Sequence, residues 1–515
     1  MDPFCSGSRT LSARPDKRGS VPWRASRLSS FSRESSPTAQ PEPLRGERKR
    51  VCDPFFSCTG KASQKKTVSL HFKGTRLYLS TPFLHHSMDT ILRFTIENFR
   101  SIAEQKSIVL TPDSHVKDLE DNVAVQGEHR YFRTAAIYGA NSSGKSNVVH
   151  GLWMMKHLVD SSVKMNNGEA LPYDPFALNA EKTQSPTLYE LDFLTGDEHY
   201  RYGFTHTAQV ICEEWLIRTD EAGKETKLFD RDEEGIGVNE VDFAEGKDLE
   251  ERTNDNRLFL SLVGQLGGDI SNQILGFFSK QLNVLSGLKT ERLHLFTGQY
   301  LQEQQPGYEQ MKEFFQRVDL GFSNLSLKVQ EFSPEDLPNE MPADLKEEIC
   351  KELSGQKHLE VFSQHGLYDQ EGNRIGEQNF DFKQMESAGT QKLFDMAGPI
   401  FATLYRGGVL MIDELDAKMH PLLTQELVAL FNAPARNPRG AQLIFTTHDT
   451  NLLSAQLLRQ DQIWFTEKDA QERTDLYSMA QMVLPDGTRP SHTTNMERNY
   501  IAGRYGAIPY FSPLI

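Results

Sequence analysis

The chain has 515 residues, of which 38% are hydrophobic and 25% are charged, so it can bury a sizeable core and has room for several domains or for one large domain with insertions. The net charge of −15 is unevenly divided, because residues 1–87 carry 16 Lys and Arg against 6 Asp and Glu and the remainder carries 40 against 65. The acidic remainder argues against a nucleic-acid surface over the whole protein, although it leaves room for a local basic groove. The 5 Cys include no CxxC pair and exclude a disulfide framework. The absence of a long apolar run predicts a cytoplasmic protein that neither spans a membrane nor is exported.

Residues 1–87 form a basic tail rich in Ser, Arg and Pro, without sustained periodicity. Such a composition cannot bury enough apolar surface to offset the entropy lost on ordering, so we expect this tail to be disordered. It could bind nucleic acid or target the chain. We favour a simpler interpretation, in which Met88 opens the patterned domain and the tail reflects an upstream start codon.

Residues 88–213 are expected to form the first half of an α/β domain. Leu92, Phe94 and Ile96 alternate along a strand, and KSIVLT is its predicted neighbour. RTAAIYG is typical of a buried strand that ends in a glycine loop, and helical spacing follows it. TLYELDFLTGDEHYRYGFTHT predicts a hairpin that turns at Gly196.

Residues 214–380 have a mixed pattern that we interpret as a helix-rich inserted lobe, and nothing in their spacing indicates catalysis. Residues 381–515 are expected to complete the domain. A helix over about 389–405 is followed by the strand GVLMIDE, the helix PLLTQELVALF and the strands AQLIFTTH and QIWFTEK. Strands that alternate with helices predict a mainly parallel sheet.

The segment GANSSGKSN matches the phosphate-binding loop pattern and lies between a predicted strand and a predicted helix. Glycines allow backbone N–H groups to face phosphate oxygens at the positive end of the helix. Lys145 would reach the β- and γ-phosphates of a nucleotide, and the Ser146 hydroxyl would bind Mg²⁺. The residues expected to contact ATP are Gly139, Ala140, Asn141, Ser142, Ser143, Gly144, Lys145, Ser146 and Asn147. A chance glycine turn is the alternative, but the strand and helix on either side favour nucleotide binding.

Two carboxylates end the apolar strand of GGVLMIDELD. A buried strand would place them at the carboxyl edge of the sheet, where ligands of α/β folds collect. Asp413 could orient Mg²⁺, and Glu414 could polarise the water that attacks the γ-phosphate. An acidic loop after a core strand is common by itself, but it is improbable beside a phosphate loop.

Three segments in the second half, MESAGTQKL, VLMIDELD and LIFTTHD, resemble the signature helix, Walker B strand and switch histidine of ABC-type ATPases, in that family's order. They are most similar to the soluble SMC- and RecF-like branch, especially bacterial anti-phage ATPases of the RloA, PARIS and OLD kinds. ILRFTIENFRSI and NYIAGRYGAIP resemble the same branch. The resemblance covers most of residues 88–515 and implies an α/β P-loop ATPase head with a mainly parallel sheet, an antiparallel β region and an inserted lobe.

The resemblance also implies roles for residues outside the phosphate loop. Ser387 and Gly389 match the signature serine and its glycine, which contact the γ-phosphate of a nucleotide held by the opposite subunit. Asp416 matches an aspartate at the dimer seam, and His448 matches the histidine that senses the γ-phosphate. Glu386, Ala388 and Thr390 depart from the transporter form of the signature.

These observations lead to an ATPase hypothesis with ATP and Mg²⁺ as its ligands, catalysed by Glu414, His448 and Lys145, in which ATP joins two heads into a homodimer or larger homo-oligomer. We expect a sensor of phage infection that controls a separate effector, such as a Toprim or HNH nuclease. The alternative is a DNA-repair or chromosome-handling ATPase that clamps DNA. A transporter motor fits least well because the signature departs from the transporter pattern.

Overall fold

The computed structural model describes residues 89–318, 320–331, 357–483 and 495–509, together with residues 346, 487, 489 and 490. They belong to one compact unit, Ser80–Ile515. The basic tail lies outside these residues, and so do residues 332–345 and 347–356 of the expected inserted lobe. No helix in the described part of the chain is long and apolar enough to cross a membrane.

A seven-stranded antiparallel sheet forms one layer, and it contains the expected first strand, its neighbour and the hairpin that turns at Gly196. The edge strand β2 follows β1 in the chain and pairs with it, and on the other side of β1 the strands β6 to β10 form four successive hairpins. The strands in spatial order are β10 (Gly235–Val238), β9 (Glu225–Asp232), β8 (Ile211–Thr219), β7 (Glu198–His206), β6 (Thr187–Thr195), β1 (Thr90–Glu97) and β2 (Lys106–Val109).

A six-stranded sheet forms the second layer, and five of its strands are parallel. Only the edge strand β18 runs antiparallel to its neighbour β17. The spatial order is β11 (Leu282–Ser286), β15 (Val409–Asp413), β16 (Gln442–Thr446), β5 (Thr134–Gly139), β17 (Ile463–Lys468) and β18 (Thr474–Ser478). The sequence-based expectation of an α/β fold with a mainly parallel core and an antiparallel β region is confirmed.

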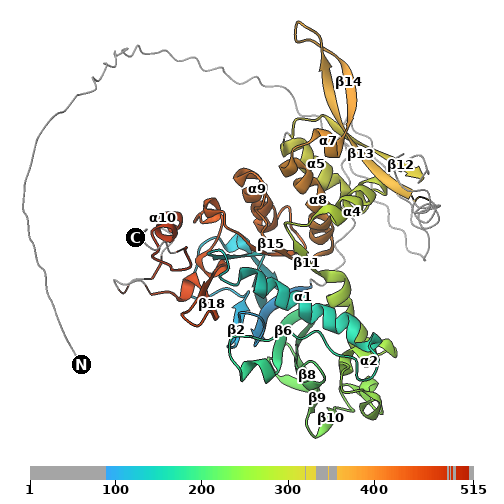
Figure 1. The fold of residues 1–515 in the computed structure, drawn as a ribbon, viewed down its shortest axis with the longest axis vertical. Helices are drawn as coiled ribbons and strands as arrows, with labels where there is room; N and C mark the ends of the chain where they lie inside the picture. Colours follow the sequence, from blue (N-terminus) through green and yellow to red (C-terminus); the bar gives the residue numbers. More distant parts are fainter. Residues whose placement is uncertain are drawn as a thin grey trace, which may run out of the picture. The chain divides into compact units, whose positions relative to one another are not determined.

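Alternate side chains of the parallel strands enter two separate cores. Ile137 and Met411 face the core that contains α1 (Lys145–Ser161) and the antiparallel sheet. Tyr138 and Ile412, one position further along, face the core that contains the helices α8 and α9. Because both faces are covered, the strands read as continuous apolar runs. Figure 1 shows α1 between the two sheets.

Helices and a third sheet complete the fold. The sheet has three antiparallel strands, and β13 and β14 form a long hairpin within it. Its strands are β12 (Asn324–Glu331), β13 (Lys357–Tyr368) and β14 (Arg374–Asp381), and a two-stranded ribbon consists of β3 (Val123–Gln126) and β4 (His129–Phe132). The remaining helices are α2 (Phe259–Gln265), α3 (Asp269–Gly276), α4 (Glu291–Gln302), α5 (Tyr308–Val318), α7 (Phe382–Met385), α8 (Ala388–Arg406), α9 (Pro421–Asn432) and α10 (Met496–Ile501).

Residues 214–380, expected as a helix-rich inserted lobe, have a more divided structure. They contain the helices α2 to α5, but they also supply most of β8, all of β9 and β10, and the edge strand β11 of the parallel sheet. The expected boundary at residue 214 falls inside β8. The helical spacing was the stronger local signal, whereas strand pairing with distant residues is set by the tertiary fold.

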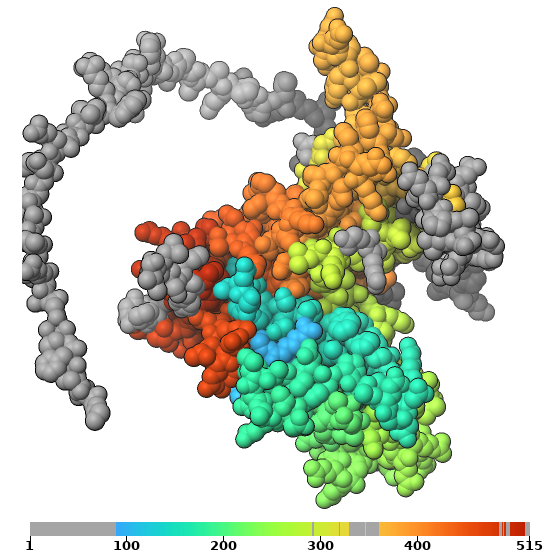
Figure 2. Space-filling model, in the orientation of Figure 1, coloured from blue at the N-terminus to red at the C-terminus, as the bar shows by residue number. Residues whose placement is uncertain are grey.

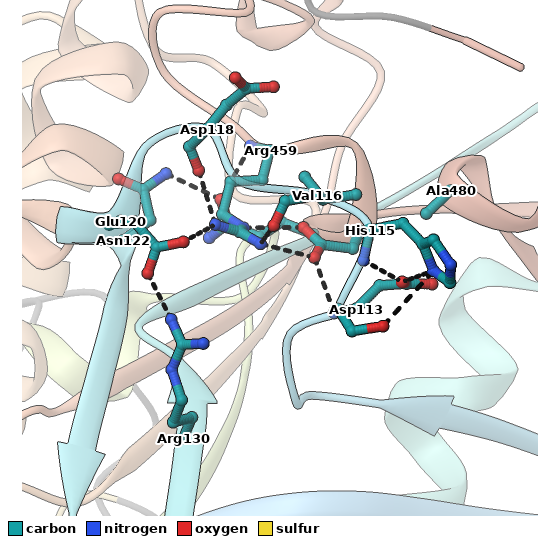
Figure 3. Close-up of polar contacts among 12 residues, drawn as sticks. Asp113, His115, Val116, Asp118, Glu120, Asn122, Arg130, Arg459 and Ala480 are labelled. Atoms are coloured by element: carbon teal, nitrogen blue, oxygen red, sulfur yellow. Dashed lines mark hydrogen bonds and ion pairs between the residues drawn. The ribbon is translucent and has the colours of Figure 1, made fainter.

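A buried guanidinium joins the segment before β3 to the segment before β17 (Figure 3). The Arg459 side chain is inaccessible to solvent and makes two parallel hydrogen bonds to the Asp461 carboxylate, each 2.9 Å long. It also donates to the carbonyl oxygens of Val116 and Asp118, at 2.8 and 2.6 Å. The planar guanidinium can make all these bonds at once, so one side chain connects segments more than 300 residues apart.

Candidate functional site

The glycine loop occupies the carboxyl end of β5, at the centre of the parallel sheet, and leads directly into α1. Ser142 and Gly144 have left-handed backbones, with φ of 65° and 105°. Alternation of backbone handedness turns successive N–H groups towards one side and makes a concavity suited to an anion. A Cβ atom on Gly139 would lie 2.4 Å from the Ser143 and Thr466 hydroxyl oxygens, so only glycine fits there.

Lys145, the first residue of α1, closes over this loop. Its Nζ donates hydrogen bonds to the carbonyl oxygens of Gly139 and Ala140, at 2.9 and 3.0 Å. Burial lowers the pKa of Lys145 to about 8, and the nearby carboxylates, Asp413 foremost, oppose that shift. The amine is thus a partly desolvated cation that bonds to neutral carbonyl groups, and a phosphate could stabilise its charge.

The next residue of α1 contacts the end of β15. Ser146 Oγ donates to Asp413 Oδ1 at 3.2 Å, and Thr446 Oγ1 of β16 donates to the same oxygen at 2.7 Å. A hydroxyl and one carboxylate, with phosphate oxygens and water, are the oxygen ligands that Mg²⁺ uses in nucleotide sites. These residues therefore fit a magnesium ion that arrives with a nucleotide.

Glu414 adopts a left-handed backbone conformation, with φ of 54°, immediately after β15. Its N–H donates to Thr446 Oγ1 at 2.7 Å, and its carbonyl oxygen accepts a hydrogen bond from Lys392 Nζ at 3.1 Å. Gly287, after β11, passes so close that a Cβ atom there would lie 2.2 Å from the Glu414 carbonyl oxygen. Glu414 is a non-glycine residue in a rarely populated conformation, and these contacts hold its backbone in place.

These residues meet around one cavity of about 530 Å³. Its lining consists of Asn141, Ser142, Ser143, Gly144, Lys145, Ser146, Asn147, Glu414, His448 and Lys468. The backbone N–H of His448 donates a hydrogen bond to Asp416 Oδ2, at 3.3 Å. Burial and the nearby charge of Lys145 lower the pKa of His448, which favours a neutral ring that can accept a proton or hydrogen bond.

The signature segment lies outside that cavity. Ser387 caps α8, where its Oγ accepts a hydrogen bond from the Thr390 N–H at 3.2 Å, and it is exposed. A Cβ atom on Gly389 would lie 2.7 Å from the Lys418 carbonyl oxygen, so the start of α8 packs against the segment that follows Glu414. The structure thus brings together the phosphate-loop, Walker B and switch residues, whereas Ser387 and Gly389 lie elsewhere on the surface.

Four supporting side chains were assigned no role from the sequence. Thr446 connects Asp413 with Glu414. Lys392 is buried in α8 and donates to three carbonyl oxygens of the loop after β15. Thr466 and Thr474, on β17 and β18, contact Ser143 from beneath the phosphate loop. Thr446 and Thr466 lie in predicted strands and Lys392 lies in the segment that resembles the signature helix, but these patterns do not show which groups the side chains contact.

Comparison with known proteins places these features in a family. Residues 135–454, more than half of the chain, match the profile of the family described as "AAA domain, putative AbiEii toxin, Type IV TA system". The matched range begins in β5 and includes the glycine loop, the signature segment, the Asp413–Glu414 pair and His448. No curated protein matches the chain.

Among solved structures, an SMC head bound to the C-winged helix domain of ScpA is 13% identical, with a TM-score of 0.34, and the match covers 75% of this chain and 97% of that one. The SMC head domain of Thermotoga maritima is 12% identical, with a TM-score of 0.33 and coverage of 75% and 98%. The recombination mediator RecF with ATP is 11% identical, with a TM-score of 0.30 and coverage of 76% and 100%. These values are too low to transfer any function.

Proposed function

The chain belongs to the family of AAA domains described as putative AbiEii toxins of a type IV toxin–antitoxin system, and from that premise we propose that it binds and hydrolyses ATP as an ABC-type ATPase head. The observation that carries this proposal is the junction of Ser146, Asp413 and Thr446 beside Lys145. A hydroxyl and an amine come from α1 and a carboxylate from the end of β15, and the two α1 residues line one cavity with Glu414.

In this proposal the loop N–H groups and Lys145 hold the β- and γ-phosphates, and Ser146 and Asp413 hold Mg²⁺. The metal, when bound, neutralises charge that develops on the phosphate oxygens. Glu414 orients the attacking water, and His448 contacts the γ-phosphate. Phosphoryl transfer needs mainly positioning and charge stabilisation, which a rigid site of this kind supplies.

The proposed active assembly is a pair of heads joined through ATP. Two features support it: Ser387 is exposed at the start of α8, and the signature residues do not line the cavity of their own chain. A second chain would present its Ser387 and Gly389 to the γ-phosphate, with Asp416 at the seam. Hydrolysis would then separate the two heads and change the shape of the assembly.

We place this ATPase in anti-phage defence, as the sensor that controls a separate effector protein of the Toprim or HNH nuclease type. The family's description names a toxin–antitoxin system, which supports a place in defence, and the sensor role rests on the resemblance of the motifs to anti-phage ATPases. A DNA-clamping role is the alternative, and ATP hydrolysis that rises strongly on addition of duplex DNA would favour it over the defence role.

A subunit-mixing experiment tests the two-chain site. Lys145→Ala removes the phosphate-binding amine, and Ser387→Arg blocks the surface offered to the partner, so each variant alone should lose ATP hydrolysis. In an equal mixture, half of the dimers are heterodimers in which one of two sites is intact, so we expect about a quarter of the wild-type rate to return. If the mixture stays inactive while both variants are folded, the site is not shared between chains.

The matched control is a mixture of Lys145→Ala with Glu414→Gln. Both changes affect residues that line the same cavity of their own chain, so neither site of a heterodimer is intact and no activity should return. Glu414→Gln alone should retain ATP and accumulate as an ATP-bound dimer in light scattering. Hydrolysis at the wild-type rate by Glu414→Gln would refute the role assigned to that carboxylate.

A further inference from the structure

The β13–β14 hairpin carries an exposed apolar surface at its tip. Tyr368 and Ile375 flank the turn and are 60% and 61% exposed, and Leu367 precedes Tyr368 at 43%. The strand partner of Tyr368 is Arg374, and the register shifts at this point. Figure 2 shows the hairpin as a narrow projection, in orange. Large apolar side chains grouped at a surface commonly mark a place of association.

The turn that joins these strands is acidic. Asp369 and Glu371 carry negative charge, and Asp369 accepts hydrogen bonds from the N–H groups of Glu371 and Asn373, which fix the turn. Arg374 pairs with Glu377, so those two charges cancel locally. The tip therefore combines two uncompensated carboxylates with three exposed apolar side chains.

A basic pocket with an apolar floor lies between α5, α8 and the end of α9. Its cavity measures about 350 Å³, and Phe314, Phe401, Leu404 and Leu430 form its buried floor. Three guanidinium groups line its rim, those of Arg317, Arg436 and Arg439. Arg317 and Arg436 form ion pairs with the carboxylate of Glu426, at 2.7 and 2.9 Å, and Glu313 adds a second carboxylate to the lining. Three positive charges against the two carboxylates leave a net charge of +1, and this local positive charge would favour an acidic partner with apolar side chains.

The hairpin of the same chain does not reach this pocket. β14 spans eight residues from the tip to α7, a distance of about 26 Å, and Figure 1 shows the tip pointing away from the helices. The pocket is lined by Phe401, Leu404 and Tyr405, near the far end of α8. A contact between tip and pocket must therefore join two molecules.

We propose that the hairpin tip of one chain docks in the basic pocket of a second chain, independently of nucleotide. Tyr368 and Ile375 enter the apolar floor, and Glu371 lies beside Arg436 and Arg439 at the rim. Because tip and pocket are different surfaces, the contact is head to tail and repeats from chain to chain, either closing a ring or extending a filament. The contact thus goes beyond the ATP-dependent dimer and uses none of its residues.

Sedimentation of the full chain without nucleotide tests this contact. The wild type should assemble as its concentration rises, and Glu371→Arg or Arg439→Glu should each weaken assembly by about tenfold or more because like charges then meet. The chain that carries both changes should regain assembly, because the reversed tip again meets a pocket of opposite charge. Tyr368→Ser combined with Ile375→Ser should abolish assembly.

Glu234→Arg is the matched control, since Glu234 is an exposed acidic residue in the turn of another hairpin, between β9 and β10. It should assemble as the wild type does. A wild-type chain that stays monomeric at every concentration overturns the proposal, as does failure of the combined variant to recover. Since no nucleotide is present, neither result affects the proposed ATPase site.

Discussion

Lys145 has a charge that its surroundings only partly stabilise. Burial lowers its pKa to about 8, so the free chain begins to lose this proton as the pH rises past about 8. Phosphate binds the protonated amine more tightly. We therefore expect the affinity for a non-hydrolysable ATP analogue to be insensitive to this group below pH about 8 and to fall by up to about tenfold per pH unit above it. Calorimetric titration over that range measures the effect.

Above pH about 8 the free energy of unfolding should change in the opposite direction to the ATP affinity, so the two measurements can be told apart. Burial also lowers the pKa of Lys392 to about 8. Between about pH 8 and the unfolded pKa of 10.5, the unfolded chain binds more protons than the folded chain, so the free energy of unfolding rises with pH in that window.

The control for the ATP measurement is Lys392→Met. Its affinity for the ATP analogue should still fall at high pH, because Lys145 is unchanged. If the affinity is flat in the wild type, Lys145 is not the phosphate-binding amine.

At the level of elements, the β13–β14 hairpin contacts the signature segment that precedes α8. His365, on β13, lies 2.9 Å from Glu386, and Glu386 directly precedes Ser387. Loss of this bond should loosen the start of α8 without affecting the phosphate loop. We expect His365→Ala to weaken ATP-dependent dimerisation of the Glu414→Gln chain by about three- to tenfold while nucleotide binding by the monomer is unchanged.

His199→Ala supplies the control for this prediction. His199 lies 2.5 Å from Asp192 in the antiparallel sheet. The His199→Ala variant therefore loses a similar histidine–carboxylate contact that does not involve α8. Light scattering and a fluorescent nucleotide report dimerisation and binding separately. Equal effects of the two alanine variants would mean that the contact of His365 with Glu386 acts only on general stability.

At the level of the whole molecule, the buried pair of Arg459 and Asp461 connects the segment before β17 with residues 113–118. Arg459→Met leaves the Asp461 carboxylate buried with one backbone donor, the Asp113 N–H at 3.0 Å. Breaking a buried pair by removing one partner costs about 3–5 kcal/mol, and we expect a loss of that size in urea unfolding. Arg459→Met combined with Asp461→Asn should recover part of the lost free energy of unfolding. A loss below about 1 kcal/mol would show that the pair contributes little.

The sequence by itself determined the local units of this protein. The strand, glycine loop and helix around Lys145 are contiguous, so their backbone preferences and apolar spacing specify them without help from the rest of the chain. The same is true of the hairpin that turns at Gly196 and of the strand that ends in Asp413 and Glu414. Local patterns of this kind also sufficed for the fold class, because alternating strands and helices favour a parallel sheet.

Only the tertiary structure decided which distant residues meet. Thr446 and Lys392 support Glu414 because β16 lies beside β15 and α8 packs over that edge of the sheet. β8 to β10 join the antiparallel sheet although helical spacing follows them in the chain. Strand order and packing depend on burial and hydrogen bonding summed over the whole fold, which no short window of sequence contains. For that reason the phosphate-binding loop could be recognised from the sequence, whereas the residues that hold its geometry were identified only from the structure.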